Sequence, residues 1–193
     1  TPIEETLVAL DQLVKDNKVR HIGASSMYTW QFAKSLWTSN ELDLHRFETM
    51  TNFYNLYYRE EEREMIPFCN DQNISVLPYS PVAKGFLTGK YTRNEKNDSI
   101  RFKTDPRLAE RFFKSEDFDI LEIVVQIANE KGVKSTQIAL TWLLEKNITA
   151  PIIGVTKKSH VEEAVESLNI KLTSNDIKRL EEPYKMHPIT GYE

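Results

Sequence analysis

The chain has 193 residues, 40% hydrophobic and 28% charged, a composition typical of one globular domain with a single core or of two very small domains. The net charge of −4 excludes a general electrostatic attraction to nucleic acid or to an anionic membrane, so a basic site has to be local. No segment approaches the ~18 consecutive apolar residues that a membrane-spanning helix needs, so we expect no membrane partner.

The cysteine content and the first residues indicate the compartment of the chain and its relation to a longer protein. The single cysteine, Cys69, excludes an internal disulfide bond and fits a reducing, cytoplasmic compartment, and we expect it to be a buried apolar group rather than a reactive thiol. The opening "TPIEETLVALDQLV" predicts an amphipathic helix with Thr1 as N-cap, Pro2 at the first helical position and Glu4 closing a capping box. Because the chain starts on a helix cap and not on methionine, we expect it to be part of a longer protein.

Strands and helices alternate in the first half of the chain. Short apolar runs that end in small or polar residues predict buried strands, and longer runs with helical spacing predict the helices between them. Thr29 is the expected cap of the first of these helices, and Pro67 is expected to kink or end the second. The predicted strands are 19–25, 46–54 and 74–80, and the helices between them are 29–40 and 59–72.

The second half continues the same alternation. Residues 92–115 are polar and show no clear period, and the helix that follows is expected to end at Gly132. Thr173 is the expected cap of the last helix. The predicted helices are 117–132, 135–147, 159–168 and 175–184, with a fourth strand at 150–156. Alternating strands and helices favour parallel β/α units, as in a β/α barrel. A doubly wound sheet is the alternative, but "IGASSM" after the first strand is not its G-x-G-x-x-G turn.

Three strand ends carry residues suited to an anionic or planar ligand. After the third strand, "PYSPVAKGFLTGKY" offers an aromatic face, a hydroxyl, backbone amides and two lysines that could hold a phosphate, or else forms a plain turn with solvated lysines. After the fourth, "IIGVTKKSHVEEAV" begins a helix whose first turn carries cations, which favours an external anion over the alternative of solvated surface charge. After the first, the hydroxyls of "GASS" could bind a carboxamide or could cap the next helix.

These segments together carry a resemblance. "YNLYYREEEREMIPFC", "VLPYSPVAKGFLTGKY" and "APIIGVTKKSHVEEAV" resemble, in this order, the aldo-keto reductase superfamily, and within it the fungal aryl-alcohol dehydrogenase-like members related to potassium-channel β-subunits. The resemblance implies a (β/α)8 TIM barrel that binds NADPH across the carboxyl ends of its strands, without a Rossmann motif. It also implies that residues 1–193 form one domain, the C-terminal half of the barrel, with strands five to eight, their helices and a C-terminal helix.

The resemblance implies a cofactor-binding role for residues at each strand end. Ser25 would bind the nicotinamide carboxamide, beside Ser26, which stands where Asn is commoner, and Tyr79 would stack on the nicotinamide ring. Lys90 would close over the phosphates, and Arg101 would clamp the adenosine half. Ser80, Pro81, Val82, Lys84 and Gly85 would line the pyrophosphate, while Gly154, Thr156, Lys157 and His160 would meet the 2′-phosphate or the ribose and Glu163 the adenine amino group.

Two positions depart from the family pattern. Thr51 stands where the family usually has a Gln beside the carboxamide, and Ala164 stands where it usually has Asn. Each loss is expected to weaken cofactor binding by roughly 0.5 to 1.5 kcal/mol.

The function implied for the parent protein is NADPH-dependent reduction of an aldehyde or ketone to an alcohol. The family's catalytic Tyr, Lys, Asp and His lie in the first half of the barrel, so we assign no catalytic residue here and expect the isolated chain to be inactive. We expect Tyr28, Tyr54, Tyr57 and Tyr58 to be packing residues. A non-catalytic, nucleotide-sensing or interaction module is the alternative. Phe102, Phe112 and Phe113 suggest an apolar substrate pocket, and the free strand edges of half a barrel predict association with the missing half or with a second copy.

Overall fold

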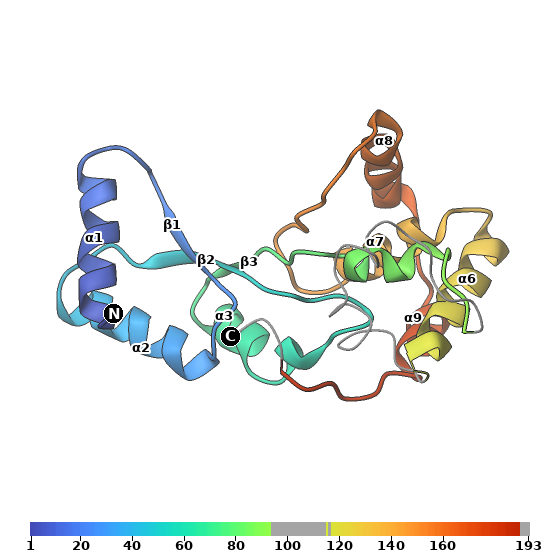
Figure 1. Cartoon of the computed structure of the whole chain (residues 1–193), viewed down its shortest axis with the longest axis horizontal. Coiled ribbons are helices and arrows are strands. Elements are labelled where there is room, and N and C mark those ends of the chain that lie inside the picture. The colour runs from blue at the N-terminus through green and yellow to red at the C-terminus, as the bar shows by residue number, and fades with distance from the viewer. Residues whose placement is uncertain (94–114, 116, 190–193) are drawn as a thin grey trace.

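The computed structural model of the chain describes residues 1–93, 115 and 117–189 (Figure 1). Three parallel strands form its sheet in the order β1 (Ile22–Ser25), β2 (Phe47–Thr51) and β3 (Ser75–Val76). Ser25 lies opposite Thr51 across the first pair, and Met50 lies opposite Val76 across the second. Helices connect successive strands, so the parallel β/α arrangement predicted for the first half of the chain is confirmed.

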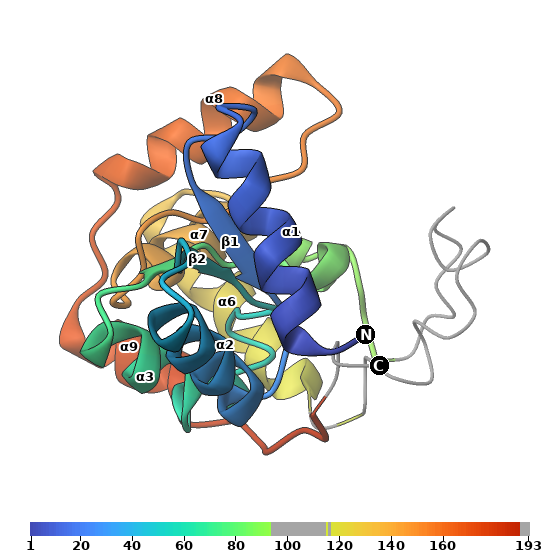
Figure 2. The same cartoon turned by 90° about the vertical axis from the view of Figure 1, so that its left-hand side faces the viewer.

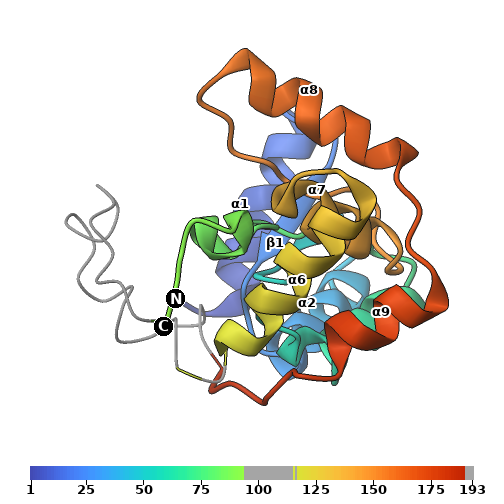
Figure 3. The ribbon, with the colours of Figure 1, turned by 90° about the vertical axis from the view of Figure 1, so that its right-hand side faces the viewer.

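Helices lie at both ends of the molecule, and α3 (Met65–Asp71) lies between them (Figure 1). The helices α1 (Ile3–Lys15) and α2 (Thr29–Glu41) lie at one end and face the viewer in Figure 2. At the other end, three helices that face the viewer in Figure 3 pack on one another: α6 (Asp117–Lys131), α7 (Ser135–Leu144) and α9 (Ser174–Glu181). The other helical segments of the described residues are α3, α8 (Lys158–Glu166) and the 3-10 turns η1 (Glu60–Glu62), η2 (Ala83–Thr88) and η3 (Ser167–Asn169).

The fourth strand predicted at 150–156 is wrong for the described chain. Two backbone bonds join this segment to the end of β3, from Thr149 N–H to Val76 O at 2.9 Å and from Ile152 N–H to Pro78 O at 2.7 Å. A single bridge forms, between Ile152 and Tyr79, and no ladder follows it. The apolar run instead leaves Ile152, Ile153 and Val155 exposed. Apolar composition alone therefore did not distinguish a strand from an extended loop here.

Several predicted helix ends shift by one residue. Pro2 and Tyr28, not Thr1 and Thr29, are the N-cap residues of α1 and α2. The helix predicted at 59–72 is interrupted, as η1 and then α3, with Glu64 as the N-cap of α3. The interruption falls before Pro67, which lies third in α3, in the first turn, where its missing N–H has no partner within the helix. Thr173 caps α9 as predicted, since its Oγ1 accepts from Asp176 N–H at 3.1 Å.

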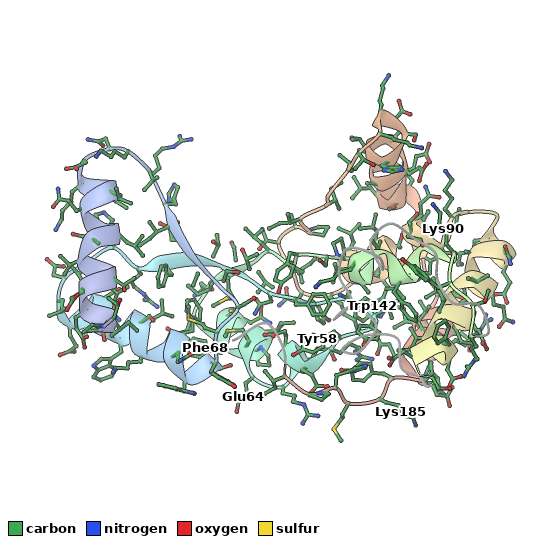
Figure 4. All side chains as sticks on the ribbon, in the orientation of Figure 1. Tyr58, Glu64, Phe68, Lys90, Trp142 and Lys185 are labelled. Atoms are coloured by element: carbon green, nitrogen blue, oxygen red, sulfur yellow. The ribbon has the colours of Figure 1, made fainter. Side chains whose placement is uncertain are left out.

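Aromatic side chains fill the core. Tyr54, Tyr57 and Tyr58 are each only 1% exposed, and the indole of Trp142 is fully buried near them (Figure 4). Their predicted packing role is confirmed, whereas Tyr28 is 42% exposed and is not a core residue. Cys69 is buried as predicted, and burial, together with the charge of Glu61, raises the pKa of its thiol to about 12. Within the described residues, each helix is too short or too polar to cross a bilayer.

Candidate functional site

The carboxyl ends of β1 and β2 bring the first group of predicted residues together. The pairing of these parallel strands sets Ser25 beside Thr51, and the Ser25 hydroxyl donates to the Thr51 carbonyl at 3.1 Å. The backbone N–H of Ser26 donates to the same carbonyl, also at 3.1 Å. Ser25 remains exposed, and its oxygen, with the proton committed to Thr51, is left to accept from a ligand N–H.

Tyr79 joins this group from the end of β3. Its backbone N–H donates to the carbonyl of Asn52 at 2.8 Å, and a bridge pairs it with Phe53. The Tyr79 ring packs on Phe53 with 5.6 Å between ring centroids, and its hydroxyl lies 3.3 Å from Ser26 Oγ. The ring is half-buried and not sealed in the interior, so one part of it is available to a planar ligand. We call Ser25, Ser26, Thr51 and Tyr79 the strand-end group.

The loop after Tyr79 has an unusual backbone. Ser80, Ala83 and Lys84 have φ values of 53°, 49° and 55°, and Gly85 has a φ of 101°, so four of six consecutive residues lie in the left-handed region. Glycine is the residue suited to such a φ, which explains Gly85 but leaves strain at the other three positions. Concentrated backbone strain of this kind is common at functional sites.

Part of the predicted anion cradle is used within the loop itself. The N–H of Ala83 donates to Ser80 O at 2.8 Å, and the N–H of Gly85 donates to Val82 O at 2.9 Å. Those two amides are therefore satisfied, and a phosphate would have to compete for them. Pro81 is buried, Val82 and Lys84 are half-buried, and Lys90 is exposed at the end of the loop.

The start of α8 lies apart from the strand-end group. The loop after Ile152 leads away from the strands, and α8 stands at its far end (Figure 1). Gly154, Thr156 and Lys157 are exposed, Lys157 is the N-cap residue and His160 is half-buried in the first turn. Gly154 has open space around it and a φ outside the left-handed region, so its backbone places no demand for glycine.

Glu163 already has a partner inside the protein. Its carboxylate pairs with the ammonium group of Lys134, in the loop between α6 and α7. Its backbone carbonyl accepts from Gln137 Nε2 at 3.2 Å, which ties α8 to α7. Arg101 and the phenylalanines at 102, 112 and 113 lie outside the described residues.

The chain matches a known protein family over most of its length. The model of the aldo/keto reductase family matches residues 1–185. The chain belongs to the aldo/keto reductase family. That family implies a (β/α)8 barrel, and the parallel three-stranded α/β sheet is compatible with it.

Three relatives of this chain come from fungi. It is 40% identical to versiconal hemiacetal acetate reductase of Aspergillus parasiticus, over 97% of this chain and 56% of the relative. It is also 40% identical to a putative aryl-alcohol dehydrogenase of Schizosaccharomyces pombe, over 97% and 57%. An aldo-keto reductase of Alternaria alternata is 37% identical, over 99% and 51%. The chain thus spans about half the length of the curated relatives it matches.

The site also has features that the sequence did not single out. Phe53 packs under the Tyr79 ring, and the fully buried Asn55 donates from Nδ2 to Ser80 O at 3.0 Å. The only signal for Asn55 was a polar residue inside an aromatic run. A cavity of about 560 Å³ lies between α1 and α2 and includes none of the predicted cofactor-binding residues. Its lining is Thr1, Pro2, Ile3, Glu4, Thr6, Leu7, Met27, Trp30, Gln31, Lys34, Ser35 and Phe47. Among the described residues, no cluster of His, Cys, Asp or Glu is suited to hold a metal ion.

Proposed function

We propose that this chain is the cofactor-binding half of an NADPH-dependent oxidoreductase that reduces small aldehydes or ketones to alcohols. In this proposal it corresponds to the part of the barrel with strands five to eight, their helices and the C-terminal helix, and the segment that stands for strand eight forms only the single bridge at Ile152 here. Family membership supports the reaction class. The single observation that carries the cofactor assignment is the strand-end group, because two hydroxyls and a half-buried aromatic face converge there, next to a strained glycine-containing loop.

The strand-end group fits a nicotinamide. The Tyr79 ring, supported from behind by Phe53, would stack on the planar ring and leave its other face toward the substrate. The Ser25 oxygen would accept from the carboxamide N–H₂, with Ser26 close by. Thr51 is too short to replace the usual glutamine, so the carboxamide has fewer partners than is common in the family.

The loop after Tyr79 fits a pyrophosphate. Gly85 has no Cβ, so its backbone can approach the pyrophosphate closely. Its φ of 101° is also one that other residues rarely adopt. Lys84 and Lys90 would supply positive charge, and Arg101 would act on the adenosine half. The loop residues in this proposal are Ser80, Pro81, Val82, Lys84 and Gly85.

The start of α8 would bind the 2′-phosphate. Gly154, Thr156 and Lys157 are exposed there, and the helix N-terminus attracts anions through its free N–H groups. His160 would assist from the first turn. Glu163 would accept from the adenine amino group only by sharing its carboxylate with Lys134. Because α8 stands away from the strands, binding in this form would place the two halves of the dinucleotide on separate elements.

When bound, NADPH supplies the hydride for carbonyl reduction. The residues of this chain would hold and orient it, and the proton would come from catalytic residues outside the chain. The proposal therefore separates binding, which this chain should show, from turnover, which needs the remainder of the protein.

The test is to titrate the purified chain and its Lys157→Glu variant with NADP⁺ and with NAD⁺ and to measure each Kd by isothermal titration calorimetry. Reversing the charge beside a 2′-phosphate should raise the Kd for NADP⁺ about tenfold or more, while the Kd for NAD⁺ should change less than about twofold. Lys171→Glu, an equal charge change at another exposed lysine, is the control. Equal effects on both nucleotides, or no binding of either by the unaltered chain, would refute the proposal.

A further inference from the structure

Asn55 is a buried side chain that links two segments of the site. Its side chain is fully buried, so it has no surface with which to touch a ligand. Its Oδ1 accepts from the N–H groups of Tyr57 and Tyr58, each at 3.0 Å, and its Nδ2 donates to the carbonyl of Ser80 at 3.0 Å. A further pair of backbone bonds between Asn55 and Tyr58, each 3.1 Å long, closes the turn after β2.

The group that Asn55 holds is the first strained residue of the loop. Ser80 has a φ of 53° and precedes Pro81, a combination that few non-glycine residues adopt without external support. Its carbonyl accepts two hydrogen bonds, from Asn55 Nδ2 and from Ala83 N–H. Since a carbonyl oxygen has two lone pairs, these bonds fix the orientation of the Ser80–Pro81 peptide.

The orientation of that peptide sets the direction of the loop. Tyr79 is fixed on its other side by the bond from its N–H to Asn52 O and by its bridge to Ile152. With Tyr79 anchored and the Ser80 carbonyl held, the chain has to leave the sheet toward the left-handed run at Ala83, Lys84 and Gly85. The turn after β2 thereby determines how the loop after β3 is presented.

We propose that Asn55 is a positioning residue for the dinucleotide: it holds the Ser80 carbonyl so that Tyr79 and the left-handed loop are preorganised before the cofactor binds. This inference rests on the proposed function, because the loop is assigned to the pyrophosphate there. Preorganisation raises affinity by removing the cost of ordering the loop on binding. Asn55 itself contacts neither cofactor nor substrate.

The first test replaces the bond to Ser80 by a repulsive contact and keeps the bonds from Tyr57 and Tyr58. In Asn55→Asp the Oδ1 acceptor for Tyr57 and Tyr58 is kept, but the donor is replaced by an oxygen that repels the Ser80 carbonyl. Hydrogen exchange of the nucleotide-free chain should speed up about tenfold at residues 80–89, and the Kd for NADP⁺ should rise about tenfold. Asn55→Ser, which is shorter and uncharged, serves if the aspartate variant does not fold.

The matched control loses a buried bond elsewhere. Ser35 is buried in α2 and donates to Gln31 O at 2.9 Å, so Ser35→Ala also deletes one side-chain bond to a carbonyl. It should lower thermal stability without changing exchange at residues 80–89 or the Kd for NADP⁺.

Rescue separates positioning from a general loss of stability. Glycine adopts a φ of 53° readily, so in a Ser80→Gly background the further change Asn55→Asp should raise the Kd for NADP⁺ only about twofold. Unchanged exchange at residues 80–89 in both Asn55 variants, or an undiminished effect in the glycine background, overturns the inference. If the unaltered chain binds no nucleotide, the proposed function fails and the cofactor role of Asn55 fails with it, whereas the exchange data still report whether Asn55 holds the loop.

Discussion

At the scale of single residues, Asp11 illustrates how one carboxylate joins two elements. Asp11 lies on α1 and is only 3% exposed. Its Oδ1 accepts from the backbone N–H of His45, a residue of the loop before β2, at 3.0 Å. The Lys15 ammonium lies 2.6 Å from its Oδ2, and His45 Nδ1 lies 2.7 Å from its Oδ1. The hydrogen bond from Lys15 and those from His45 hold the pKa of Asp11 well below its ordinary value of 3.8.

This lowered pKa predicts an acid-sensitive contribution to stability. A group whose pKa is lower in the folded chain stabilises it at pH values above the unfolded pKa, and this contribution is lost as the pH falls toward the folded pKa. Asp11→Asn should therefore lower the urea midpoint of unfolding clearly at pH 7, and the difference from the unaltered chain should shrink below about pH 4. The difference between the two urea midpoints is measured by urea titration, monitored by circular dichroism, at pH 7 and at pH 3.

Glu145 provides the control, because it is an exposed carboxylate after α7. Glu145→Gln should leave the midpoint nearly unchanged at both pH values. A difference between Asp11→Asn and the unaltered chain that stays constant down to pH 3 would contradict the proposed ionic origin of the effect.

Residue roles could be predicted where the partner is close in sequence. The Thr173 cap was predictable because its partner, Asp176, is three positions away. Asp11 pairs with His45 across 34 positions, and Asn55 reaches Ser80 across 25. Such pairs exist only once the strands are in register, so a single sequence contains no local signal for them.

At the scale of elements, the contact between β1 and β2 depends on a glycine. Gly23 lies opposite Thr49 in the parallel pair. A Cβ at this position would lie 2.0 Å from Thr49 Oγ1 and 3.2 Å from the Thr49 carbonyl. The first distance is far inside van der Waals contact, so a side chain here would push the two strands apart or force the threonine to move.

Gly23→Ala should therefore destabilise the chain by about 1–3 kcal/mol in urea unfolding. Adding Thr49→Ala should restore part of the loss, because it removes the closest atom while leaving the carbonyl contact; the two changes should thus be non-additive. Gly154→Ala is the control for the loss of a glycine, since nothing lies within 4 Å of the added atom. A Gly23→Ala chain as stable as the unaltered one would show that β1 and β2 separate at little cost.

The periodic spacing of apolar residues predicted most helices, but not all element types. Amphipathic runs such as 117–132 became helices with nearly the expected ends, and Gly132 stands just past α6 with a φ of 65°. The prediction of strands was less accurate. The run 150–156 is as apolar as the run 74–80 that contains β3, yet the backbone bonds described for it reach only the end of β3. Whether such a run becomes a strand depends on neighbours that its own residues do not specify.

At the scale of the whole molecule, the extended segment after α7 exposes apolar side chains beyond its single bridge to Tyr79. Ile153 and Val155 are 38% and 42% exposed, beyond the single bridge at Ile152. Extended apolar segments with a free edge can pair with another chain. Helix α8 also exposes apolar groups, Val161 and Val165, but its backbone groups are bonded within the helix.

Light scattering of the chain across a concentration series should therefore show a mass that rises with concentration. The double variant Ile153→Lys/Val155→Lys should shift the mass toward that of a monomer, because two charges on an edge oppose strand pairing. Val161→Lys/Val165→Lys makes the same change in charge on similarly exposed valines of α8 and should behave like the unaltered chain. If both variants dissolve the association equally, general charge repulsion and not the extended segment is responsible; a monomer at every concentration would show that this edge does not pair at all.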